Sequence, residues 1–293
     1  MLRRAELLVC LALAPGCSLV FPLEDAPDVP DAPPPPSCPA PGLTPTFESP
    51  TLHIFDTRRC KQYTTSTAAG LAVGPCDAGV GGPIEVFEGE IAAPLTPASI
   101  VLQRELLSSA VINPEGTWLI TLESNLDGSA IETYERSSTA WTHLAETVID
   151  QDAPLGTPSA GPDARLAYFV RPDPIVDPGA NNQVVELQAG SDGQWEPAMT
   201  YDSPFGELEP IAFISGLHLT ANGLAVVFTV NNPDSTSRRL LGYADRESLD
   251  QPFGAARAIT FAASDLFNDS SLGNDCARVY LTDFTGLSFI AQD

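Results

Sequence analysis

Short apolar stretches that follow polar tight turns recur along the chain, and within each stretch apolar and polar positions alternate as in a half-buried β-strand. Five such turn-and-strand units are STAAGLAV (66–73), INPEGTWLI (112–120), AGPDARLAY (160–168), LTANGLAVV (219–227) and LGNDCARVY (272–280). Their equivalent turn positions are Gly70, Gly116, Ala164, Gly223 and Cys276, which are 46, 48, 59 and 53 residues apart. Glycine accepts a positive φ without strain. We therefore expect the turns at Ala164 and Cys276 to differ from the others or to carry strain.

The same order of predicted strands follows each turn. In the second unit these strands are TWLITLES (117–124), AIETYERS (130–137) and WTHLAETV (141–148). Four antiparallel strands in about 50 residues, repeated along the chain, are typical of a β-propeller. A two-sheet β-sandwich also contains many short strands, but the near-regular spacing of the turns favours the propeller.

The two ends of the repeat region complement each other. The last unit contains only three strands and ends with LSFIAQD (287–293), whereas TLHIFDT (51–57) is a strand without a unit of its own. If residues 51–57 complete the last blade, the ring closes and no sheet edge stays exposed. We therefore predict an all-β fold, a five-bladed β-propeller over residues 51–293 whose N-terminal strand closes the last blade.

Two segments resemble a known group of propellers. The turn Asn-Pro-Glu-Gly at 113–116 resembles the Ser-Pro-Asp-Gly turn of the TolB-like, WD-related propeller repeats. The segment RESLDQPFG (246–254) resembles the connection between the third and fourth strands in secreted bacterial members. The resemblance covers roughly residues 51–293 and implies the propeller fold, but it transfers no catalytic or binding residue.

The N-terminus has the features of a secretory signal. Two arginines precede the apolar stretch LLVCLALA (7–14), whose eight residues are too few to span a bilayer. Cleavage after Ala14 would fit an A-x-A pattern, but it would leave Pro15 as the first residue, which is a poor substrate for signal peptidase. Cleavage between Gly16 and Cys17 is the alternative that we favour, which makes residues 1–16 a signal peptide.

The residues around Cys17 resemble the bacterial lipoprotein signal, in which small residues precede a cysteine. This resemblance implies a diacylglycerol thioether on Cys17 and an acylated α-amine, and several acyl chains anchor a protein firmly. Ser18 stands where an aspartate would favour retention in the inner membrane, so the resemblance implies an outer-membrane lipoprotein. Residues 18–50 contain 11 prolines and no Lys or Arg, which predicts a semi-rigid spacer. Residues 17–50 would then tether the propeller to the membrane.

Six cysteines are present, of which Cys10 would leave with the signal and Cys17 would carry lipid. The other four are Cys38, Cys60, Cys76 and Cys276, which allow three disulfide pairings in an oxidising compartment. The predicted hairpin around Ala68 places Cys60 opposite Cys76, which favours that pair and leaves Cys38 with Cys276. No CxxC motif or Cys/His cluster indicates zinc.

The charge of the chain limits its partners. The net charge is −24, with 38 acidic residues against 14 basic ones, and Lys61 is the only lysine. Such a chain has no basic surface that could neutralise phosphates, so we expect no binding of nucleic acid and no charge-driven docking on anionic lipid. The acidic surface favours solubility, and weak binding of divalent cations is the alternative.

Motifs of enzymes are absent from the sequence. It contains no GxSxG elbow and no Walker or dinucleotide-binding glycine pattern. We expect the three histidines, His53, His143 and His218, to be packed or exposed residues instead of general bases. The segments 115–118 and 192–195 partly match the Asp-box of sialidases, but with the wrong spacing, so we expect Trp118 and Trp195 to pack between strands.

Two acidic segments partly resemble calcium loops. In ESNLDG (123–128), Glu123, Asn125 and Asp127 fall at ligand positions one, three and five, but Tyr134 stands where a bidentate glutamate is needed. Asp-Gly between two predicted strands is a hairpin turn, and this is the interpretation that we favour. A second acidic loop consists of Asn268, Asp269, Asn274 and Asp275, and we interpret it in the same way. We therefore expect no metal, no cofactor and no enzymatic activity.

These features together predict an envelope-anchored lipoprotein. Its propeller would bind or scaffold an envelope protein or glycan through loops on one face of the ring. A hydrolase that acts on glycan is the alternative, and it would require Asp, Glu and Arg side chains in the central pocket. A purely structural envelope component is a third possibility.

Overall fold

The structure is a computed structural model, and it describes residues 53–56, 60–78, 83–91, 99–125, 128–138, 140–149, 154–170, 182–204, 213–231, 239–259, 269–273, 278–282 and 287–291. The predicted signal peptide, Cys17 and the proline-rich tether lie outside the described residues. No helix in the described part of the chain has the length and the apolar character needed to cross a membrane.

The described strands form antiparallel sheets of four strands each. Blade 1 contains β2 (Thr64–Ser66), β3 (Leu71–Asp77), β4 (Ile84–Glu90) and β5 (Ile100–Arg104). Blade 2 contains β6 (Leu107–Ile112), β7 (Trp118–Asn125), β8 (Gly128–Ser137) and β9 (Ala140–Ile149). Blade 3 contains β10 (Pro154–Ala160), β11 (Arg165–Val170), β12 (Gln183–Ala189) and β13 (Trp195–Asp202). Blade 4 contains β14 (Phe213–Leu219), β15 (Ala225–Asn231), β16 (Arg239–Asp245) and β17 (Arg257–Ile259).

One further sheet, here called the terminal sheet, combines both ends of the described chain. Its order is β1 (His53–Asp56), β20 (Leu287–Ala291), β19 (Arg278–Thr282) and β18 (Asp269–Leu272). β1 pairs antiparallel with β20, with His53 opposite Phe289 and Ile54 opposite Ser288. Residues 53–56 thus lie beside the last strand of the chain, and the predicted partner of residues 51–57 is the one that the structure shows.

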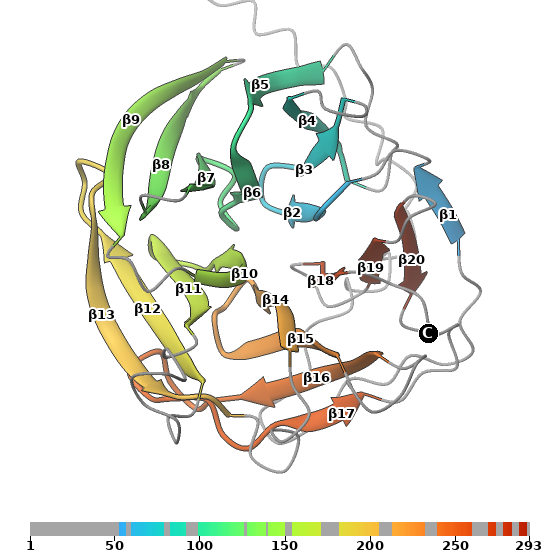
Figure 1. Cartoon of the computed structure of the whole chain (residues 1–293), viewed down its shortest axis with the longest axis vertical. Coiled ribbons are helices and arrows are strands. Elements are labelled where there is room, and N and C mark those ends of the chain that lie inside the picture. The colour runs from blue at the N-terminus through green and yellow to red at the C-terminus, as the bar shows by residue number, and fades with distance from the viewer. Residues whose placement is uncertain are drawn as a thin grey trace, which may run out of the picture. The chain divides into compact units, whose positions relative to one another are not determined.

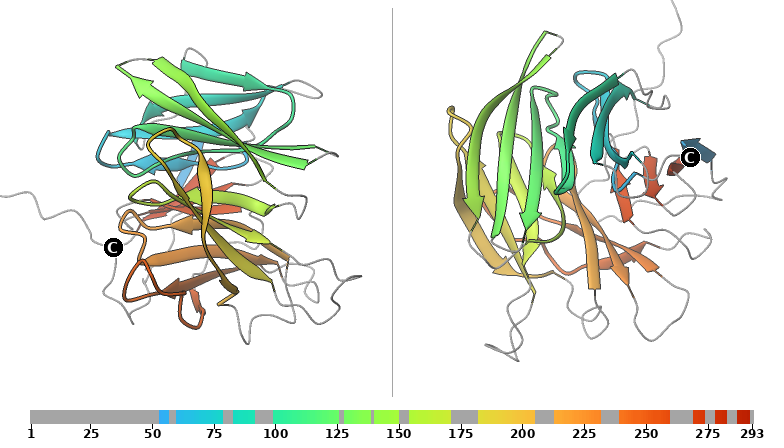
Figure 2. Two further views of the ribbon diagram at one scale, coloured as in Figure 1. Left: turned by 90° about the vertical axis from the view of Figure 1, so that its left-hand side faces the viewer. Right: turned by 45° about the horizontal axis from the view of Figure 1, so that its top comes forward.

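The blades are arranged around a common centre, with β2, β6, β10 and β14 innermost and β5, β9, β13 and β17 outermost (Figure 1). Within each blade the strands follow one another in chain order from the inside to the outside. The views in Figure 2 show the twist of the blades, which follows from the right-handed twist of β-strands. The fold is an all-β propeller, as the repeat predicts.

Adjacent blades are joined by apolar side chains, because alternate residues of a strand point to opposite faces of its sheet. On β7, Leu119 packs between blades 1 and 2, whereas its neighbour Ile120 packs between blades 2 and 3. Between blades 3 and 4, the rings of Phe169 and Phe228 meet edge to face with their centroids 6.4 Å apart. The core therefore consists of successive layers between blades, and each blade depends on its neighbours.

Hydroxyl groups add polar links between blades. The backbone amide of Ile112 in blade 2 donates a 3.1 Å hydrogen bond to Thr64 Oγ1 in blade 1. The amide of Leu219 in blade 4 likewise donates to Ser159 Oγ in blade 3 at 2.8 Å. All four residues belong to innermost strands, which pair with another strand on one side only. The hydroxyls therefore accept hydrogen bonds from backbone amides that have no partner within their own sheet.

The glycine turns have the conformation that the repeat predicts. Gly70, Gly116 and Gly223 have φ angles of 67°, 72° and 67°. The amide of Gly116 donates to the carbonyl of Asn113 at 2.9 Å, which closes the turn before β7. A positive φ at these positions is the physical reason for glycine in three of the five units.

The turn at Ala164 differs, as expected for a residue other than glycine. Both Asp163 and Ala164 have a positive φ, of 54° and 55°. The amide of Arg165 donates to the carbonyl of Pro162 at 3.1 Å, so the turn has two central residues in the left-handed region. Such a conformation costs roughly 1–2 kcal/mol per residue without glycine, and the prediction of a different, strained turn is confirmed here. Cys276 lies outside the described residues.

The connections between strands leave the blades at two ends. Because neighbouring strands are antiparallel, second-to-third connections and the crossovers from one blade to the next share one end, here called the loop end. In blades 3 and 4, the strands β11, β13, β15 and β17 end at the loop end, and β12, β14 and β16 begin there. At the loop end of blade 2, by contrast, Asn125 pairs with Gly128, so that only two residues connect β7 to β8.

Candidate functional site

A group of charged side chains lies between blades 1 and 2 at the loop end, and we call its four residues the Arg104 cluster. Arg104 is the last residue of β5, and its Nη2 donates to the hydroxyl of Tyr134 at 2.8 Å. Its Nε lies 3.3 Å from Glu123 Oε1 and 3.7 Å from Glu132 Oε2. The Tyr134 hydroxyl donates in turn to the Glu132 carboxylate.

Strand geometry explains why these side chains meet. Tyr134 on β8 pairs with Leu119 on β7, which packs against blade 1. Glu123 and Glu132 are an even number of residues from Leu119 and Tyr134 along their strands, so they point the same way. The exposed fractions of the Arg104, Glu123 and Glu132 side chains are 38%, 27% and 16%. The cluster is therefore packed on one side and open to solvent on the other.

The surroundings perturb the acid–base properties of the cluster. Burial raises the pKa of the Glu123 carboxyl above its usual range, the Glu132 carboxylate adds to the rise, and the Arg104 guanidinium opposes it. The Glu146 carboxylate on β9 adds a smaller rise to the pKa of Glu123. Burial and the contact with Glu132 also raise the pKa of the Tyr134 hydroxyl. Charged groups with perturbed pKa values that meet in a partly open cluster make it a candidate binding site.

A second network joins the same two blades near their outer strands. Glu88 on β4 accepts from Arg136 Nη2 at 2.9 Å and from Trp141 Nε1 at 2.6 Å. The Arg136 guanidinium also lies 5.7 Å from the centroid of the Trp141 ring. Each carboxylate oxygen already has a donor, so we interpret this network as a contact that holds blade 2 against blade 1.

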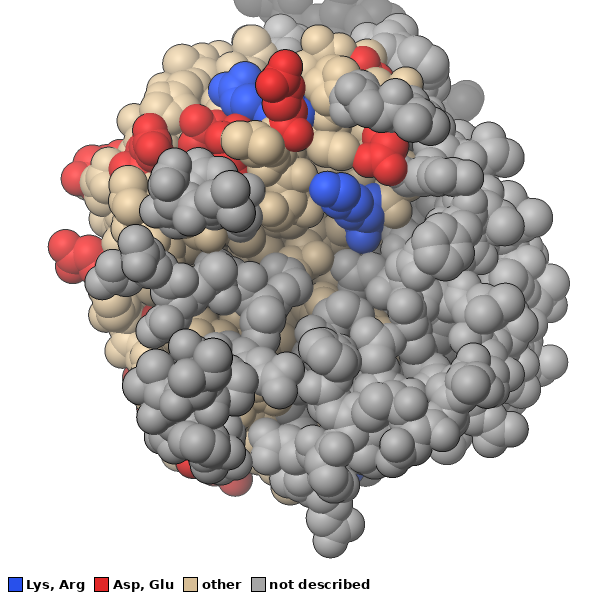
Figure 3. All heavy atoms as spheres, in the orientation of Figure 1, with Lys and Arg blue, Asp and Glu red and all other residues tan. Residues whose placement is uncertain are grey.

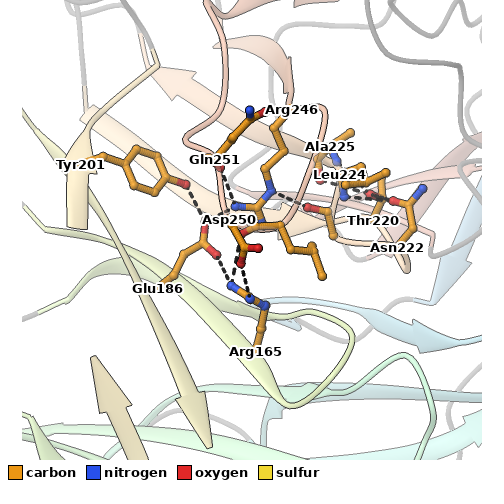
Figure 4. A network of polar contacts seen from close by, with 12 residues as sticks. Arg165, Glu186, Tyr201, Thr220, Asn222, Leu224, Ala225, Arg246, Asp250 and Gln251 are labelled. Atoms are coloured by element: carbon orange, nitrogen blue, oxygen red, sulfur yellow. Dashed lines mark hydrogen bonds and ion pairs between the residues drawn. The ribbon is translucent and has the colours of Figure 1, made fainter. Parts of the chain in front are cut away.

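A third network is buried between blades 3 and 4 (Figure 4). Glu186 on β12 accepts from Arg246 Nη1 at 2.6 Å and from the Tyr201 hydroxyl at 2.7 Å. Arg165 Nη1 lies 3.6 Å from the second oxygen of Glu186, and its Nη2 lies 3.4 Å from Asp250. The Glu186 and Arg246 side chains are both 0% exposed. Burial, followed by the charge of Glu186, raises the pKa of the Tyr201 hydroxyl, so Tyr201 stays a donor.

The segment 246–254, which resembles a connection of TolB-like propellers, supplies much of this network. It connects β16 to β17, which are the third and fourth strands of blade 4. The Arg246 guanidinium lies 4.3 Å from the centroid of the Phe253 ring and donates to the carbonyl of Gln251 at 3.2 Å. The amide of Gly254 donates to the carbonyl of Asp245 at 2.8 Å and closes the loop. The residues of this motif thus stabilise the blade.

Cys60 and Cys76 form a disulfide within blade 1, the pair that the hairpin favours. The predicted centre of the hairpin is displaced, because Thr64 pairs with Val73. Cys60 nevertheless pairs with Cys76, since one additional residue on the first strand compensates for the displacement. Cys38 and Cys276, the other predicted pair, lie outside the described residues.

Replacing both Cys60 and Cys76 with alanine is expected to lower the free energy of unfolding by about 3 kcal/mol, because the disulfide restricts a short loop of the unfolded chain. Urea unfolding of the variant and the unmodified chain, each with and without a reducing agent, measures the effect. The reducing agent should lower the midpoint of the unmodified chain by more than that of the variant, which keeps only Cys38 and Cys276 as a possible pair. Equal midpoints for the two proteins under oxidising conditions would contradict this prediction.

The two histidines whose side chains are described occupy contrasting positions. His143 on β9 is exposed, and its ring meets that of Tyr134 edge to face at 5.3 Å between centroids. His218 on the innermost strand β14 is 2% exposed, and its Nε2 has no hydrogen-bond partner. Burial lowers the pKa of His218 to about 3. Both positions agree with the expectation of packed or exposed residues, and the side chain of His53 is not described.

Acidification below pH 6.5 is expected to destabilise the fold through His218. The imidazole takes up a proton near pH 6.5 in the unfolded chain but stays neutral in the fold down to about pH 3. The unfolded state therefore binds more protons in this window, and stability falls with decreasing pH by up to about 1.4 kcal/mol per pH unit. Urea unfolding at pH 7 and pH 5 should show a smaller pH dependence for His218→Gln than for the unmodified chain. The exposed His143→Gln is the control, and an equal loss in both variants would contradict the prediction.

The tryptophans and the partial calcium loop have structural roles. The rings of Trp118 and Trp195 meet edge to face with their centroids 6.0 Å apart, between blades 2 and 3. Trp195 Nε1 donates to Thr133 Oγ1 at 2.8 Å, so the expected packing is confirmed. Asn125 pairs with Gly128, so β7 and β8 form a hairpin at this point, as we predicted. The described residues contain no group of three or more His, Cys, Asp or Glu side chains that could hold a metal ion.

The ionic networks could not be read from the sequence. Glu186 and Arg246 are 60 residues apart, and Arg136 and Glu88 are 48 residues apart. Their contacts depend on which face of a strand meets the next blade. The only local signal is the arginine that opens the segment 246–254, which the resemblance points out without giving its partner.

The sequence matches no protein-family model and none of the curated proteins. TolB from Acinetobacter baumannii is similar in structure, with a TM-score of 0.47 and 10% identity over 80% of this chain and 55% of that chain. For a putative TolB from Agrobacterium tumefaciens the TM-score is 0.47, with 12% identity over 79% of this chain and 75% of that chain. CoXyl43, a GH43 β-xylosidase/α-arabinofuranosidase from a compost microbial metagenome, has a TM-score of 0.52. Its identity is 9% over 84% of this chain and 94% of that chain. The chain spans only about half the length of the Acinetobacter TolB, and its likeness to these proteins is one of fold: a distant structural similarity to TolB-like β-propellers.

Proposed function

We propose that this chain is a bacterial envelope lipoprotein whose propeller binds or scaffolds an envelope protein or glycan. The observation that carries the proposal is the rigid scaffold of packed blades, in which β11, β13, β15 and β17 end, and β12, β14 and β16 begin, at the loop end. Loops that a rigid scaffold positions at one end are the usual place for binding residues. The packed layers between the blades supply that scaffold.

The proposal includes an anchor at the N-terminus. The signal peptide ends at Gly16, Cys17 carries lipid, and residues 17–50 hold the propeller away from the outer membrane. A disulfide between Cys38 and Cys276 would attach this tether to the terminal sheet. Cys17→Ser is expected to move the protein from the membrane fraction to the soluble fraction, and unchanged retention in membranes would contradict the anchor.

We also propose that the terminal sheet is the fifth blade and closes the ring. On one side β18 contacts β14 and β15 of blade 4. On the other side, the ring centroids of Tyr280 on β19 and Tyr63 are 4.5 Å apart. Tyr280 also packs with Ala72 and Phe87 of blade 1. These contacts support a sheet that fills the gap between blades 4 and 1.

Deletion of residues 51–57 tests the closure of the ring, because it removes β1 and exposes an edge of the terminal sheet. The midpoint of thermal unfolding should fall. Deletion of the seven residues 26–32 of the tether is the matched control and should leave the midpoint unchanged. An unaltered melting curve for the first deletion would overturn the closure.

The binding role is tested by shortening one connection at each end of the strands. Replacing residues 171–182 with a two-residue Asn-Gly turn is expected to abolish retention of the purified protein on envelope material. The same replacement at residues 91–99, at the opposite end of blade 1, is the control and should keep it. Outer-membrane protein and purified peptidoglycan are offered separately, so that a protein partner and a glycan partner are distinguished. Absence of retention for the unmodified chain on both materials would leave a purely structural role.

A glycan hydrolase remains the alternative from another class. It needs acids and arginines at the centre of the ring, whereas the innermost strands of blades 1–4 read TTS, LSSAVI, PLGTPSA and FISGLHL. The corresponding strand of the terminal sheet, β18, reads DSSL and adds one acid and no arginine. The carboxylates of the Arg104 cluster lie between two blades and are bound by arginine and tyrosine. This placement supports binding over catalysis, so we propose no enzymatic activity.

A further inference from the structure

A buried hydroxyl without a partner lies beside the Arg104 cluster. Thr121 is 0% exposed, and its Oγ1 has no hydrogen-bond partner. On β7 it stands directly opposite Glu132 on β8 and two residues before Glu123. The three side chains therefore point to the same face of the blade. Buried polar groups are nearly always satisfied, so this hydroxyl is free to accept a hydrogen bond from a ligand at the cluster.

The surrounding charges leave the site negative; Figure 3 shows acidic and basic side chains together on the face of the described blades 1 and 2. Glu123 and Glu132 share one guanidinium, that of Arg104. The Lys61 ammonium donates to the carbonyl of Leu107 at 3.0 Å, and Leu107 stands opposite Glu123 in the sheet. Among the described contacts, Lys61 forms no ion pair with the cluster. Glu146 adds a third carboxylate to the field at Glu123. A cation from outside would therefore be attracted to the open side of the cluster.

We infer that the Arg104 cluster binds a primary ammonium group, that of a lysine side chain on a partner protein. An ammonium has three N–H donors and no acceptor, and the site offers three acceptors, namely the carboxylates of Glu123 and Glu132 and the hydroxyl of Thr121. The carboxylates stay partly exposed, at 27% and 16% of their side chains, which gives access from the loop end. The inference rests on the proposed binding function and names the chemistry of the partner at this place.

Titration of the full chain with acetyl-lysine methylamide tests the site, because the side-chain ammonium is the only charge of this probe. Binding is followed by chemical shifts of the Thr121 methyl group at low ionic strength. The dissociation constant should rise about tenfold in Glu123→Gln, which removes one charge-assisted hydrogen bond. The probe acetylated on its side-chain nitrogen carries no charge and should not bind. Glu85→Gln, which changes a half-buried glutamate that accepts from Gln103, is the control and should bind like the unmodified chain.

Thr121→Val separates binding from stability. Valine has the shape of threonine without the hydroxyl, so the variant should unfold at a temperature roughly 2–4 °C higher, since a buried unsatisfied group is removed. The same variant should bind the probe more weakly. Higher stability together with weaker binding is expected of a hydroxyl kept for a ligand, and a purely structural threonine would not show it.

Three outcomes would overturn the inference: equal binding of the charged and the acetylated probe, no binding of either, or unchanged affinity in both Glu123→Gln and Thr121→Val. Retention of the chain on envelope material is measured in parallel. If the chain is retained but does not bind the probe, the ammonium site is wrong and the proposed binding function stands. If neither is observed, both fail.

Discussion

Replacing Glu186 with glutamine is expected to lower the free energy of unfolding by about 3–5 kcal/mol, because removal of one partner from a buried ion pair leaves the other charge uncompensated. Glu186 and Arg246 are both 0% exposed and 2.6 Å apart. Glutamine keeps the size of the side chain and can still accept from Tyr201, so the loss reports the charge and not a cavity. The second guanidinium, that of Arg165, increases the positive charge left behind (Figure 4).

Urea unfolding monitored by tryptophan fluorescence measures this effect. Asp250→Asn is the matched control, because it removes a carboxylate that contacts the same network from the surface, where its side chain is 91% exposed. Exposed pairs contribute little, so this variant should stay within about 0.5 kcal/mol of the unmodified chain. A loss below about 1 kcal/mol for Glu186→Gln would show that the buried network does not hold blades 3 and 4 together.

A double variant tests the same contact in the opposite direction. Glu186→Met combined with Arg246→Met removes both charges, and apolar replacements of whole buried pairs are often tolerated. The double variant should therefore be less destabilised than the sum of the two single variants. Arg246 also donates to the carbonyl of Gly223 at 2.8 Å, so we expect only partial recovery. Full additivity would contradict a direct coupling between the two charges.

The repeat of the blades could be predicted because it depends on local chemistry. Each unit places a tight turn before an alternating strand, and Gly70, Gly116 and Gly223 occupy the positive-φ position of that turn. Even the exception was visible, since Ala164 stands where the other turns have glycine and adopts the strained conformation. The same hairpin predicts the disulfide, although the first strand has one residue more than its partner between the Thr64–Val73 pair and the Cys60–Cys76 pair.

The polar networks could not be predicted because they depend on contacts between blades. The sequence presents Glu123 only as part of an incomplete calcium loop, whereas the structure brings it to Arg104 from another blade. Glu186 gave no signal at all, because one buried glutamate in an alternating strand looks like the solvent-facing residues around it. Which face of a strand is covered depends on the next blade, and that is set by the closure of the ring and not by the local pattern.

Gly116→Ala is expected to cost roughly 3–5 kcal/mol, because two separate effects add. The φ of 72° is unfavourable for any residue with a side chain. In addition, a Cβ at this position would lie 2.2 Å from the Cβ of Ala69 and 2.8 Å from Ser66 Oγ, both in blade 1. Ser66 Oγ donates to the carbonyl of Pro114 at 2.6 Å, so the added methyl group would also disturb a link between the first two blades.

Gly70→Ala separates the two effects, since its φ of 67° is similar and a Cβ there would meet no atom within 4 Å. This control should lose only the conformational part, about 1–2 kcal/mol. The difference between the two variants in urea unfolding then measures the packing of blade 2 against blade 1. A larger loss at residue 116 would show that the close approach of the Ala69 and Ser66 side chains requires glycine there in addition to the positive φ. Equal losses in the two variants would instead mean that the blades can separate at this point without cost, and would contradict a tightly packed contact between them.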